Sequence, residues 1–574
     1  MRTSHLLFVA LIFISSMATA QEADTSWRAK GDHGAVVTGS REAADAGIEM
    51  LKSGGNAVDA AVATMLVQSV TESSLFCFGG EVPIMVYDAK RGTVEVLRGL
   101  GASPQLATAQ WFNENRKGLI QGRDDLANCV VPGFLDAAIT ALDRYGTKSF
   151  TDCAQSMLKV LRTRVNIAPE ELAKMREARA RNFDGKKWIA EHQNFLKMIE
   201  RLVEAESKAG HDRQRGLRAV TDYFYRGPIA RELDAWFTAN NGLLRFSDFA
   251  RHFTRVEEPL SINYRGYTVC KCGVWTQGPV LLQTLSMMQA YEDRGLDLSG
   301  FPTDSANYTH LLAETMKLCF ADRDAYLADP DFVEVPIKEL LAKEYIQKRV
   351  TLYKHDAASQ TQQPGDPYKV EALLGKSPRD HLITSGRSSD TSSCLVADQW
   401  GNVVSATPSG WGGVIAGDTG VELNSRMIGL TTWEGHPSYL VPGKRPRITL
   451  TPTMVLKDGK PVFCVSVAGG DQQDQASIQV VLNRLRFNLD PEQSVRNPRI
   501  GTDHHINWFG HLPAQLGSLT VPRQFKEEVV EDLRKRGHKV TIARPAATAV
   551  VLAIDPVTGV KHGAGDPGRN ARAH

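Results

Sequence analysis

The segment 394–407 restricts the fold of this chain more than any other part of the sequence. It contains two short apolar runs, 394–397 and 403–407, separated by the turn-forming residues Asp398, Gly401 and Asn402. Two such runs joined by Asp, Gly and Asn are typical of a β-hairpin. The sequence therefore predicts two paired strands about two-thirds of the way along the 574 residues.

A cluster of hydroxyl side chains, Thr391, Ser392 and Ser393, directly precedes this hairpin. A threonine at the edge of a strand can serve in packing alone. It can also become a nucleophile if the bond between Asp390 and Thr391 is cut, because the new N-terminus supplies an α-amine that acts as a base for the hydroxyl. The cluster by itself does not decide between these two roles.

Residues 1–20 have the pattern of a signal peptide. A basic start, Arg2 and His5, precedes an apolar run over 6–14, and Ala-Thr-Ala offers a cleavage site directly before Gln21. The apolar run is too short to cross a membrane, and no cysteine at the cleavage site could carry a lipid anchor. A buried N-terminal helix fits less well, because the sequence turns polar directly after the run. We therefore expect an exported protein, periplasmic or secreted, without a membrane anchor.

The composition is that of an ordinary soluble globular protein, with 42% hydrophobic and 23% charged residues. The 67 basic and 65 acidic residues nearly balance and form no basic block, so nothing indicates a nucleic-acid partner. Eight cysteines are too few for a disulfide scaffold in a chain of this length, and we expect most of them to be buried. Neither Cys270 and Cys272 nor His504 and His505 have companion ligands nearby in the sequence. We therefore predict no metal and no cofactor.

The apolar periodicity changes at about residue 390. Before it, helical patterns dominate, and the charged segment 169–220 indicates solvated helices outside the core. Residues 355–390 are polar and weakly patterned, as expected of a mobile linker. After residue 390 the sequence predicts strands over 394–407, 449–456, 461–468, 538–543 and 547–554, with helices over 474–487 and 523–537. Strands enclosed by helices on both outer faces would form an α+β fold, a four-layer αββα sandwich.

Short motifs follow one another in a fixed order along almost the whole mature chain. They occupy residues 54–61, 79–80, 131–133, 225–227, 263–267 and 316–323 before the linker, and 442–446, 451–453 and 563–567 after it. In these motifs the chain resembles the γ-glutamyltransferase family of N-terminal-nucleophile hydrolases, and most closely its acylase-like and amidohydrolase-like branch. The resemblance implies a precursor that cuts itself between Asp390 and Thr391. The products would be a large subunit, 21–390, and a small subunit, 391–574.

The resemblance also implies the catalytic residues. Thr391 matches the nucleophile, Ser409 matches a second hydroxyl that supports it, and Gly469 and Gly470 match the diglycine that stabilises the oxyanion. A threonine hydroxyl is a weak nucleophile, but an α-amine that titrates near ~8 can take its proton at neutral pH. Glycine lets backbone N–H groups approach the developing charge closely. The alternative for the diglycine is a plain turn from strand to helix.

The residues that bind a γ-glutamyl group in this family are not retained. Leu100 stands at the position of the arginine that binds the α-carboxylate, and Arg98 lies two residues away, on the same face of a strand. Gly429 replaces the aspartate that binds the α-ammonium, and Ile448 and Thr449 replace two adjacent serines. A buried ammonium without its carboxylate partner loses several kcal/mol of binding, so we predict against efficient γ-glutamyl transfer.

Other residues are candidates for a different pocket. Asn424 begins the segment that carries the lost aspartate, and Arg426 could bind a substrate carboxylate through two hydrogen bonds. Arg426 could equally be an exposed arginine on a loop. Trp411 could line an acyl pocket or pack in the core. The segment 427–442, which is longer in the transferases, is short here, so a more open site would suit water as the acceptor.

Three functions follow from these residues. The first is an exported, self-processing N-terminal-threonine amidohydrolase that acts on a small amide, for example one whose acyl part carries a carboxylate. The second is a γ-glutamyl hydrolase or transferase in which Arg98 takes the carboxylate. The third is a non-catalytic relative that binds a ligand or partner through the same cleft.

Overall fold

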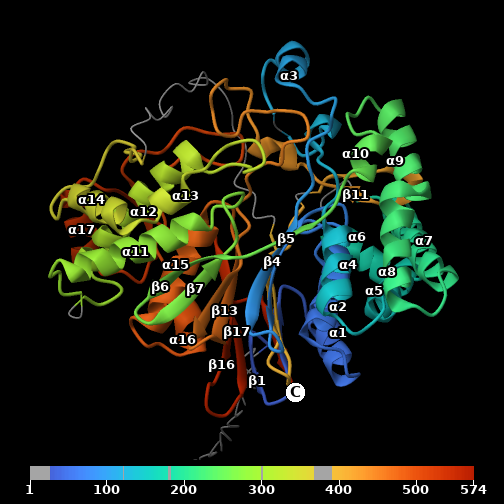
Figure 1. Ribbon diagram of the computed structural model, residues 1–574, viewed down its shortest axis with the longest axis horizontal. Helices are drawn as coiled ribbons and strands as arrows, with labels where there is room; N and C mark the ends of the chain where they lie inside the picture. The colour runs from blue at the N-terminus through green and yellow to red at the C-terminus, as the bar shows by residue number, and fades with distance from the viewer. Residues whose placement is uncertain (1–25, 121, 179–182, 299–300, 368–390, 411) are drawn as a thin grey trace, which may run out of the picture.

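Two seven-stranded antiparallel sheets lie face to face in the middle of the molecule (Figure 1). The computed structural model describes residues 26–120, 122–178, 183–298, 301–367, 391–410 and 412–574. The first sheet has the order β18 (Asn570–Ala573), β2 (Ala35–Thr38), β8 (Cys394–Ala397), β9 (Val403–Ala406), β3 (Val82–Asp88), β4 (Thr93–Gly99) and β5 (Arg255–Glu257). The second has the order β1 (Arg28–Gly31), β17 (Lys561–Gly565), β16 (Thr548–Ile554), β13 (Lys460–Ala468), β12 (Thr453–Lys457), β7 (Tyr267–Lys271) and β6 (Leu260–Tyr264).

Helices cover the outer face of each sheet, which confirms the predicted four-layer αββα sandwich. The first sheet packs against α1 (Arg41–Lys52), α2 (Ala57–Thr71) and α4 (Phe134–Tyr145), and α5 (Phe150–Val165) packs on the outer side of α2. The second packs against α11 (Pro279–Asp293), α15 (Gln472–Leu485) and α16 (Pro491–Arg496). Farther out, α12 (Ala306–Tyr326) packs on α11, and α17 (Glu527–Lys535) packs on α12. These two groups of helices lie on opposite sides of the paired sheets (Figure 1).

The strands are apolar on both faces because each face meets a different layer. In β8, Leu395 and Ala397 belong to the core between the two sheets, whereas Cys394 and Val396 belong to the core under α2. Strand β13 repeats this alternation, with Phe463, Val465 and Val467 facing the helices and Cys464 facing the first sheet. Side chains at odd positions of β8 therefore point between the sheets.

The predicted hairpin is confirmed, and its turn is bound to the start of α2. The Asp398 carboxylate accepts hydrogen bonds from the N–H groups of Trp400 and Asn402, both at 2.9 Å. It also accepts from the Ala57 N–H at the first turn of α2 at 2.9 Å, where the helix dipole favours a negative charge. Asn56 caps this helix as its residue type suggests, accepting from Val58 and Asp59 N–H at 2.9 and 3.1 Å.

Several predicted elements have other bounds or other partners. The strand expected over 449–456 begins only at Thr453, and the helix expected from 523 begins at Glu527. The strand expected over 538–543 is β15 (Lys539–Ile542), which pairs in parallel with β14 (Ser518–Val521) outside the sandwich. Residues 169–220 form α6 (Pro169–Ala178), α7 (Gly185–Lys208) and α8 (Arg213–Thr221), as expected.

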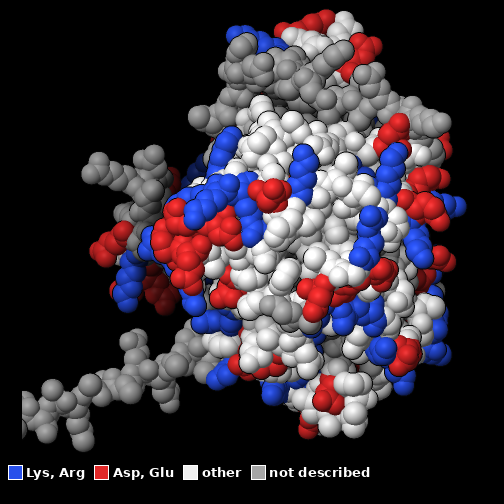
Figure 2. Space-filling model, turned by 90° about the vertical axis from the view of Figure 1, so that its left-hand side faces the viewer, with Lys and Arg blue, Asp and Glu red and all other residues white. Residues whose placement is uncertain are grey.

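Buried cysteines and mixed surface charge also match the sequence expectations. All eight cysteines are buried as free thiols. Acidic and basic side chains are interspersed on the face shown in Figure 2. Among the described helices, none is both long enough and apolar enough to cross a bilayer.

A buried ion pair joins the second sheet to α15. The Lys271 ammonium on β7 is fully buried, lies 2.9 Å from the Asp474 carboxylate, and donates to the Thr451 carbonyl and the Thr453 hydroxyl at 2.7 and 2.9 Å. Burial raises the pKa of Asp474 to about 6, although Lys271 opposes this shift. The pair fixes the first turns of α15 against β7 and β12.

Replacing Lys271 alone should be strongly destabilising, because it leaves the Asp474 carboxylate without a partner in the core. We expect Lys271→Met to lower the free energy of unfolding by about 3–5 kcal/mol, and Lys271→Met with Asp474→Leu to recover most of that loss. Urea unfolding followed by tryptophan fluorescence measures both. Lys208→Met, which breaks the exposed pair with Glu204, is the control and should cause no measurable change. A double variant no more stable than Lys271→Met would contradict this account.

Candidate functional site

Thr391 lies between the two sheets, and the strand alternation explains why. It precedes β8 by three residues, and the odd positions of β8 face the second sheet. Thr391 forms a β-bridge with Ser409, which follows β9, so the ladder between β8 and β9 is resumed beyond the strand ends. Thr391 is 1% exposed and Ser409 is fully buried. The structure thus brings together the two hydroxyl residues predicted from the sequence.

The side-chain amide of Gln473, in the first turn of α15, contacts the Thr391 hydroxyl. One end of the amide lies 3.3 Å from both Thr391 Oγ1 and Thr449 Oγ1, and the other end lies 3.1 Å from the carbonyl oxygens of Thr449 and Val467. Carbonyl oxygens only accept, so the NH₂ group is assigned to their side. Gln473 Oε1 then accepts from both hydroxyls. This contact fixes the Thr391 side chain toward α15.

Ser392 points the opposite way, toward α2, as the alternation requires. Its hydroxyl donates to the Glu72 carboxylate at 2.5 Å and accepts from Gln68 Nε2 at 2.7 Å. Gln68 Nε2 also donates to the Ser393 carbonyl at 3.1 Å. Burial raises the pKa of Glu72, and its hydrogen bond from Ser392 is the largest of the opposing effects. This buried polar cluster holds the backbone on the far side of Thr391.

Arg426 is bound to Ser409 and to a carboxylate, so the alternative of an exposed loop arginine is wrong. It is 1% exposed, donates through Nη2 to Ser409 Oγ, and forms an ion pair with Glu81. Its guanidinium carbon lies 5.4 Å from the centroid of the Trp508 ring. Arg426 therefore reaches the site, but Glu81 already balances its charge.

Gly469 and Gly470 connect β13 to α15 and precede Gln473 by four and three residues. Their φ angles are +147° and +58°, and a Cβ on Gly470 would lie 2.7 Å from the Phe509 ring. A side chain is therefore excluded at this turn. Within the described part of the chain, no protein group accepts from the Gly470 N–H. The diglycine thus forms the turn from strand to helix that was the alternative to an oxyanion role. The same turn also leaves a backbone N–H donor available, three residues before the Gln473 that contacts Thr391.

A buried arginine on α12 holds this turn in place through hydrogen bonds. Arg323 on α12 donates to the Asp471 carboxylate at 2.5 Å and to the Gln277 side-chain oxygen at 2.9 Å. The other Asp471 oxygen accepts from the Trp508 N–H at 2.8 Å. The Arg323 guanidinium is the main attractive influence that lowers the pKa of Asp471. The residue that follows the diglycine is thus held on both sides.

The other predicted pocket residues have different surroundings. Thr449 lies at the site through Gln473. The Asn424 side chain is engaged by backbone, donating to the Gly79 and Val130 carbonyls at 2.7 and 2.9 Å. Arg98 lies 2.5 Å from Asp329 and 3.6 Å from Asp331, so two carboxylates neutralise its charge. Trp411 and Asp390 lie outside the described residues.

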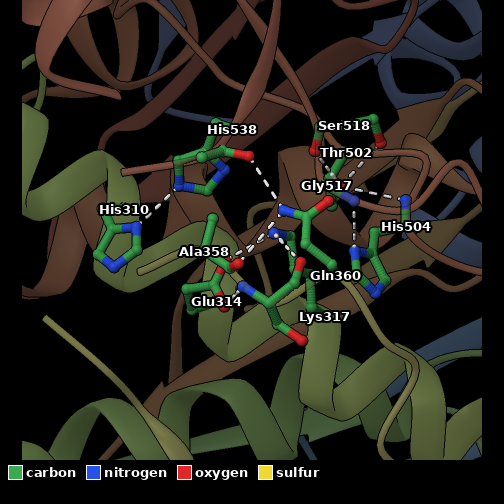
Figure 3. A network of polar contacts seen from close by, with 12 residues as sticks. His310, Glu314, Lys317, Ala358, Gln360, Thr502, His504, Gly517, Ser518 and His538 are labelled. Carbon is green, nitrogen blue, oxygen red and sulfur yellow. Dashed lines mark hydrogen bonds and ion pairs between the residues drawn. The ribbon is translucent and has the colours of Figure 1, made fainter. Parts of the chain in front are cut away.

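A second buried polar cluster brings together α12, the loop that contains Ala358 and Gln360, and His538 directly before β15 (Figure 3). Its His310, Glu314 and His538 are the one group in the described residues that could hold a metal ion. The three already bond to protein groups: His310 Nδ1 lies 2.7 Å from His538 Nε2, and Glu314 accepts from Lys317 Nζ at 2.6 Å. A cation would have to displace the Lys317 ammonium. We therefore interpret the cluster as a structural network.

Known proteins similar to this chain share its fold and most of its length. The model of the family described as gamma-glutamyltranspeptidase matches residues 43–574. The chain belongs to the γ-glutamyltranspeptidase family. It is 29% identical over 559 residues to the glutathione hydrolase proenzyme of Bacillus subtilis (strain 168), covering 95% of this chain and 91% of that protein. It is 28% identical to the acylase ACY 1 proenzyme of Pseudomonas sp. (strain SE83), covering 92% and 91%.

The solved structure of LmbA2991HD has a TM-score of 0.82 to this chain at 31% identity, covering 95% of this chain and 99% of that one. The γ-glutamyltranspeptidase fold therefore extends over both halves of the chain, on either side of residue 390. Relatives named as hydrolases and relatives named as acylases resemble it about equally. The predicted family and fold are confirmed, and the choice of substrate depends on the pocket.

The histidine network should make stability depend on pH. Burial lowers the pKa of His538 to about 2, whereas an unfolded histidine titrates near ~6.5. Below pH ~6.5 the unfolded chain binds a proton at this position that the folded chain does not, so stability falls as the pH falls. Between pH 7.5 and 5.0, His538 should account for a loss of about 2 kcal/mol in the free energy of unfolding.

Urea unfolding at the two pH values measures this loss. His538→Asn should reduce the pH dependence by that amount, although it also lowers stability at both pH values by removing the bond to His310. His211→Asn, at an exposed position, is the control and should behave like the unchanged protein. An unaltered pH dependence in His538→Asn would refute the account.

Proposed function

We propose that this γ-glutamyltranspeptidase relative is a self-processing amidohydrolase that cleaves a small amide through an acyl-enzyme on Thr391. The observation that carries the proposal is the surroundings of the Thr391 hydroxyl. It is buried between the sheets, held by Gln473, next to Ser409 and at the diglycine turn that begins α15. Relatives named as hydrolases and acylases support the reaction class.

The precursor activates itself by cleavage after Asp390. The Thr391 oxygen adds to the Asp390 carbonyl carbon, an ester bond forms as the C–N bond breaks, and the hydroxyl proton moves to the released α-amine. Water then hydrolyses the ester, giving the Asp390 carboxylate and a free Thr391 hydroxyl. With residues 1–20 as an export signal, the mature enzyme consists of subunits 21–390 and 391–574, in the periplasm or outside the cell.

Each turnover uses the same atoms. The Thr391 α-amine takes the proton of the hydroxyl, whose oxygen attacks the substrate carbonyl, and the amine then passes the proton to the leaving group. Backbone N–H groups at Gly469 and Gly470 stabilise the oxyanion at the start of α15. Ser409, oriented by Arg426, lies beside the nucleophile. Water resolves the ester and restores the hydroxyl.

Two features favour a general amide over a γ-glutamyl amide. Arg98, which would have to bind the α-carboxylate, is already paired with Asp329 and Asp331. A Cβ at Gly429 would lie 2.8 Å from the Trp508 ring, so the lost aspartate does not fit beside that tryptophan. This chain therefore lacks both of the ligands that a γ-glutamyl hydrolase needs for its substrate. A non-catalytic protein, in turn, would not need the arrangement around Thr391.

Thr391→Ala should abolish both self-cleavage and hydrolysis. On a denaturing gel the variant should run as one band close to the 63.1 kDa chain, reduced only by signal removal, whereas the unchanged protein gives two bands. Edman sequencing should find Thr391 at the start of the smaller subunit and Gln21 at the start of the larger. Thr391→Ser keeps a hydroxyl and should retain slow cleavage. Hydrolysis by Thr391→Ala would refute the mechanism.

Substrate preference separates the amidohydrolase from a γ-glutamyl enzyme. We expect kcat/KM for γ-glutamyl-p-nitroanilide to be at least about 100-fold lower than for the best acyl-p-nitroanilide without an α-ammonium, because burying that ammonium without a carboxylate partner costs several kcal/mol. A chromogenic assay with a panel of acyl groups measures both. Turnover of γ-glutamyl-p-nitroanilide as fast as the best acyl substrate would favour the γ-glutamyl enzyme.

A further inference from the structure

We propose that Arg447 binds a carboxylate on the acyl part of the substrate, which makes this enzyme specific for amides of dicarboxylic acids. The inference rests on the proposed function, because it assigns the substrate class of the same site. The sequence suggested Arg98 and Arg426 as the arginines that bind a substrate carboxylate. Each of them already forms an ion pair with an acidic side chain of the protein.

Arg447 is a buried cation whose guanidinium has no direct partner among the described residues. It exposes 5% of its surface, and its Nη1 is completely buried without a hydrogen bond. Within the described residues, its guanidinium makes no hydrogen bond and no ion pair. Other arginines of this region, Arg323 and Arg445 among them, bond to carboxylates. An unpaired buried guanidinium is costly, and a bidentate carboxylate is the ligand that suits it best.

The backbone places Arg447 on the same side as Thr449. Between them, Ile448 accepts from the Gln277 N–H at 3.1 Å, donates to the Trp275 carbonyl at 3.0 Å, and packs in the core between the sheets. Leu450 packs in the same core as Ile448, so Arg447 and Thr449, which alternate with these two residues, face away from it. Thr449 contacts Gln473, which contacts the Thr391 hydroxyl.

A second chain of contacts leads from Arg447 to the site. The Trp508 indole N–H donates to the Arg447 carbonyl, and the Trp508 ring lies against the Arg426 guanidinium, which donates to Ser409 Oγ. Arg447 is therefore held in position between the two arms that support Thr391 and Ser409. In our proposal the acyl chain of the substrate extends from Thr391 along these contacts toward Arg447.

The charges around Arg447 leave room for an anion. Burial lowers the pKa of Arg447 to about 10, with Arg323 adding to the shift, so the group is still protonated at neutral pH. Asp324 and Asp471 attract it, but each is bonded to Arg323. Burial lowers the pKa of His436 to about 3, and the charge of Arg447 adds to this shift, so the His436 side chain is neutral. A substrate carboxylate would be the first direct partner of Arg447.

Hydrolysis of two matched substrates tests the proposal. The pair is glutaryl-p-nitroanilide, which carries a terminal carboxylate, and its neutral methyl ester. The unchanged enzyme should prefer the acid by about 100-fold or more in kcat/KM. Arg447→Met should lose at least about 100-fold on the acid and change less than about 3-fold on the ester. Arg447→Lys should lie between the two on the acid.

Two readouts separate this proposal from the proposed function. Self-cleavage into two subunits should be unaffected in Arg447→Met, because no substrate carboxylate takes part in it. Glutarate, but not glutaramide, should raise the thermal midpoint of the unchanged protein and not that of Arg447→Met, a result that needs no catalysis. If the unchanged protein neither cleaves itself nor hydrolyses any amide, the proposed function is overturned, whereas the glutarate measurement still tests the role of Arg447.

A purely structural role of Arg447 gives a different pattern. Arg447→Met would then lose activity equally on acid and ester, or unfold at a lower temperature with no effect of glutarate on the unchanged protein. Either result, or a preference of the unchanged enzyme for the ester, overturns the proposal. Arg445→Met serves as the comparison, because it removes one of the arginines that pair with the Asp331 carboxylate. This variant should have a lower thermal midpoint and an unchanged preference for the acid.

Discussion

The two-residue period of the central strands decides where each functional side chain lies. In the segment before β8, Thr391 points between the sheets and Ser392 points to α2, so neighbouring hydroxyls serve different layers. Ser405 and Thr407 keep the same alternation beyond them and bond across the gap, Thr407 Oγ1 lying 2.9 Å from Ser466 Oγ. A shift of one residue in the register of β8 would put the nucleophile in the helical layer.

Charge in the interior is arranged around this constraint. Three buried ion pairs lie close to the turn between β13 and α15 or to the nucleophile. They are Lys271 with Asp474, Arg323 with Asp471 and Arg426 with Glu81. Each charge alone would be costly in such a position, and the pairs fix the backbone that carries the donors. Arg447, by contrast, has no such pair among the described residues.

Local signals in the sequence were enough for much of the fold. The turn at Asp398 and the strands on either side of it depend on residues close together in the chain, and both were predicted. The pairing of Arg426 with Glu81 and of Gln473 with Thr391 joins residues 345 and 82 positions apart, which no local pattern encodes. Strand β15 was predicted, but its parallel partner β14 was not, because periodicity does not specify which strand pairs with which.

The order of the strands has a mechanical consequence. In the first sheet, β8 and β9 lie between β2 and β3, and in the second, β12, β13, β16 and β17 lie between β1 and β7, so segments from either side of residue 390 interleave. The C-terminal His574 also exchanges backbone hydrogen bonds with Gly34 at 3.0 and 3.1 Å. Two fragments made by a cut at this point would be woven through one another. They could part only by breaking both ladders, so the severed protein should still melt as a single body.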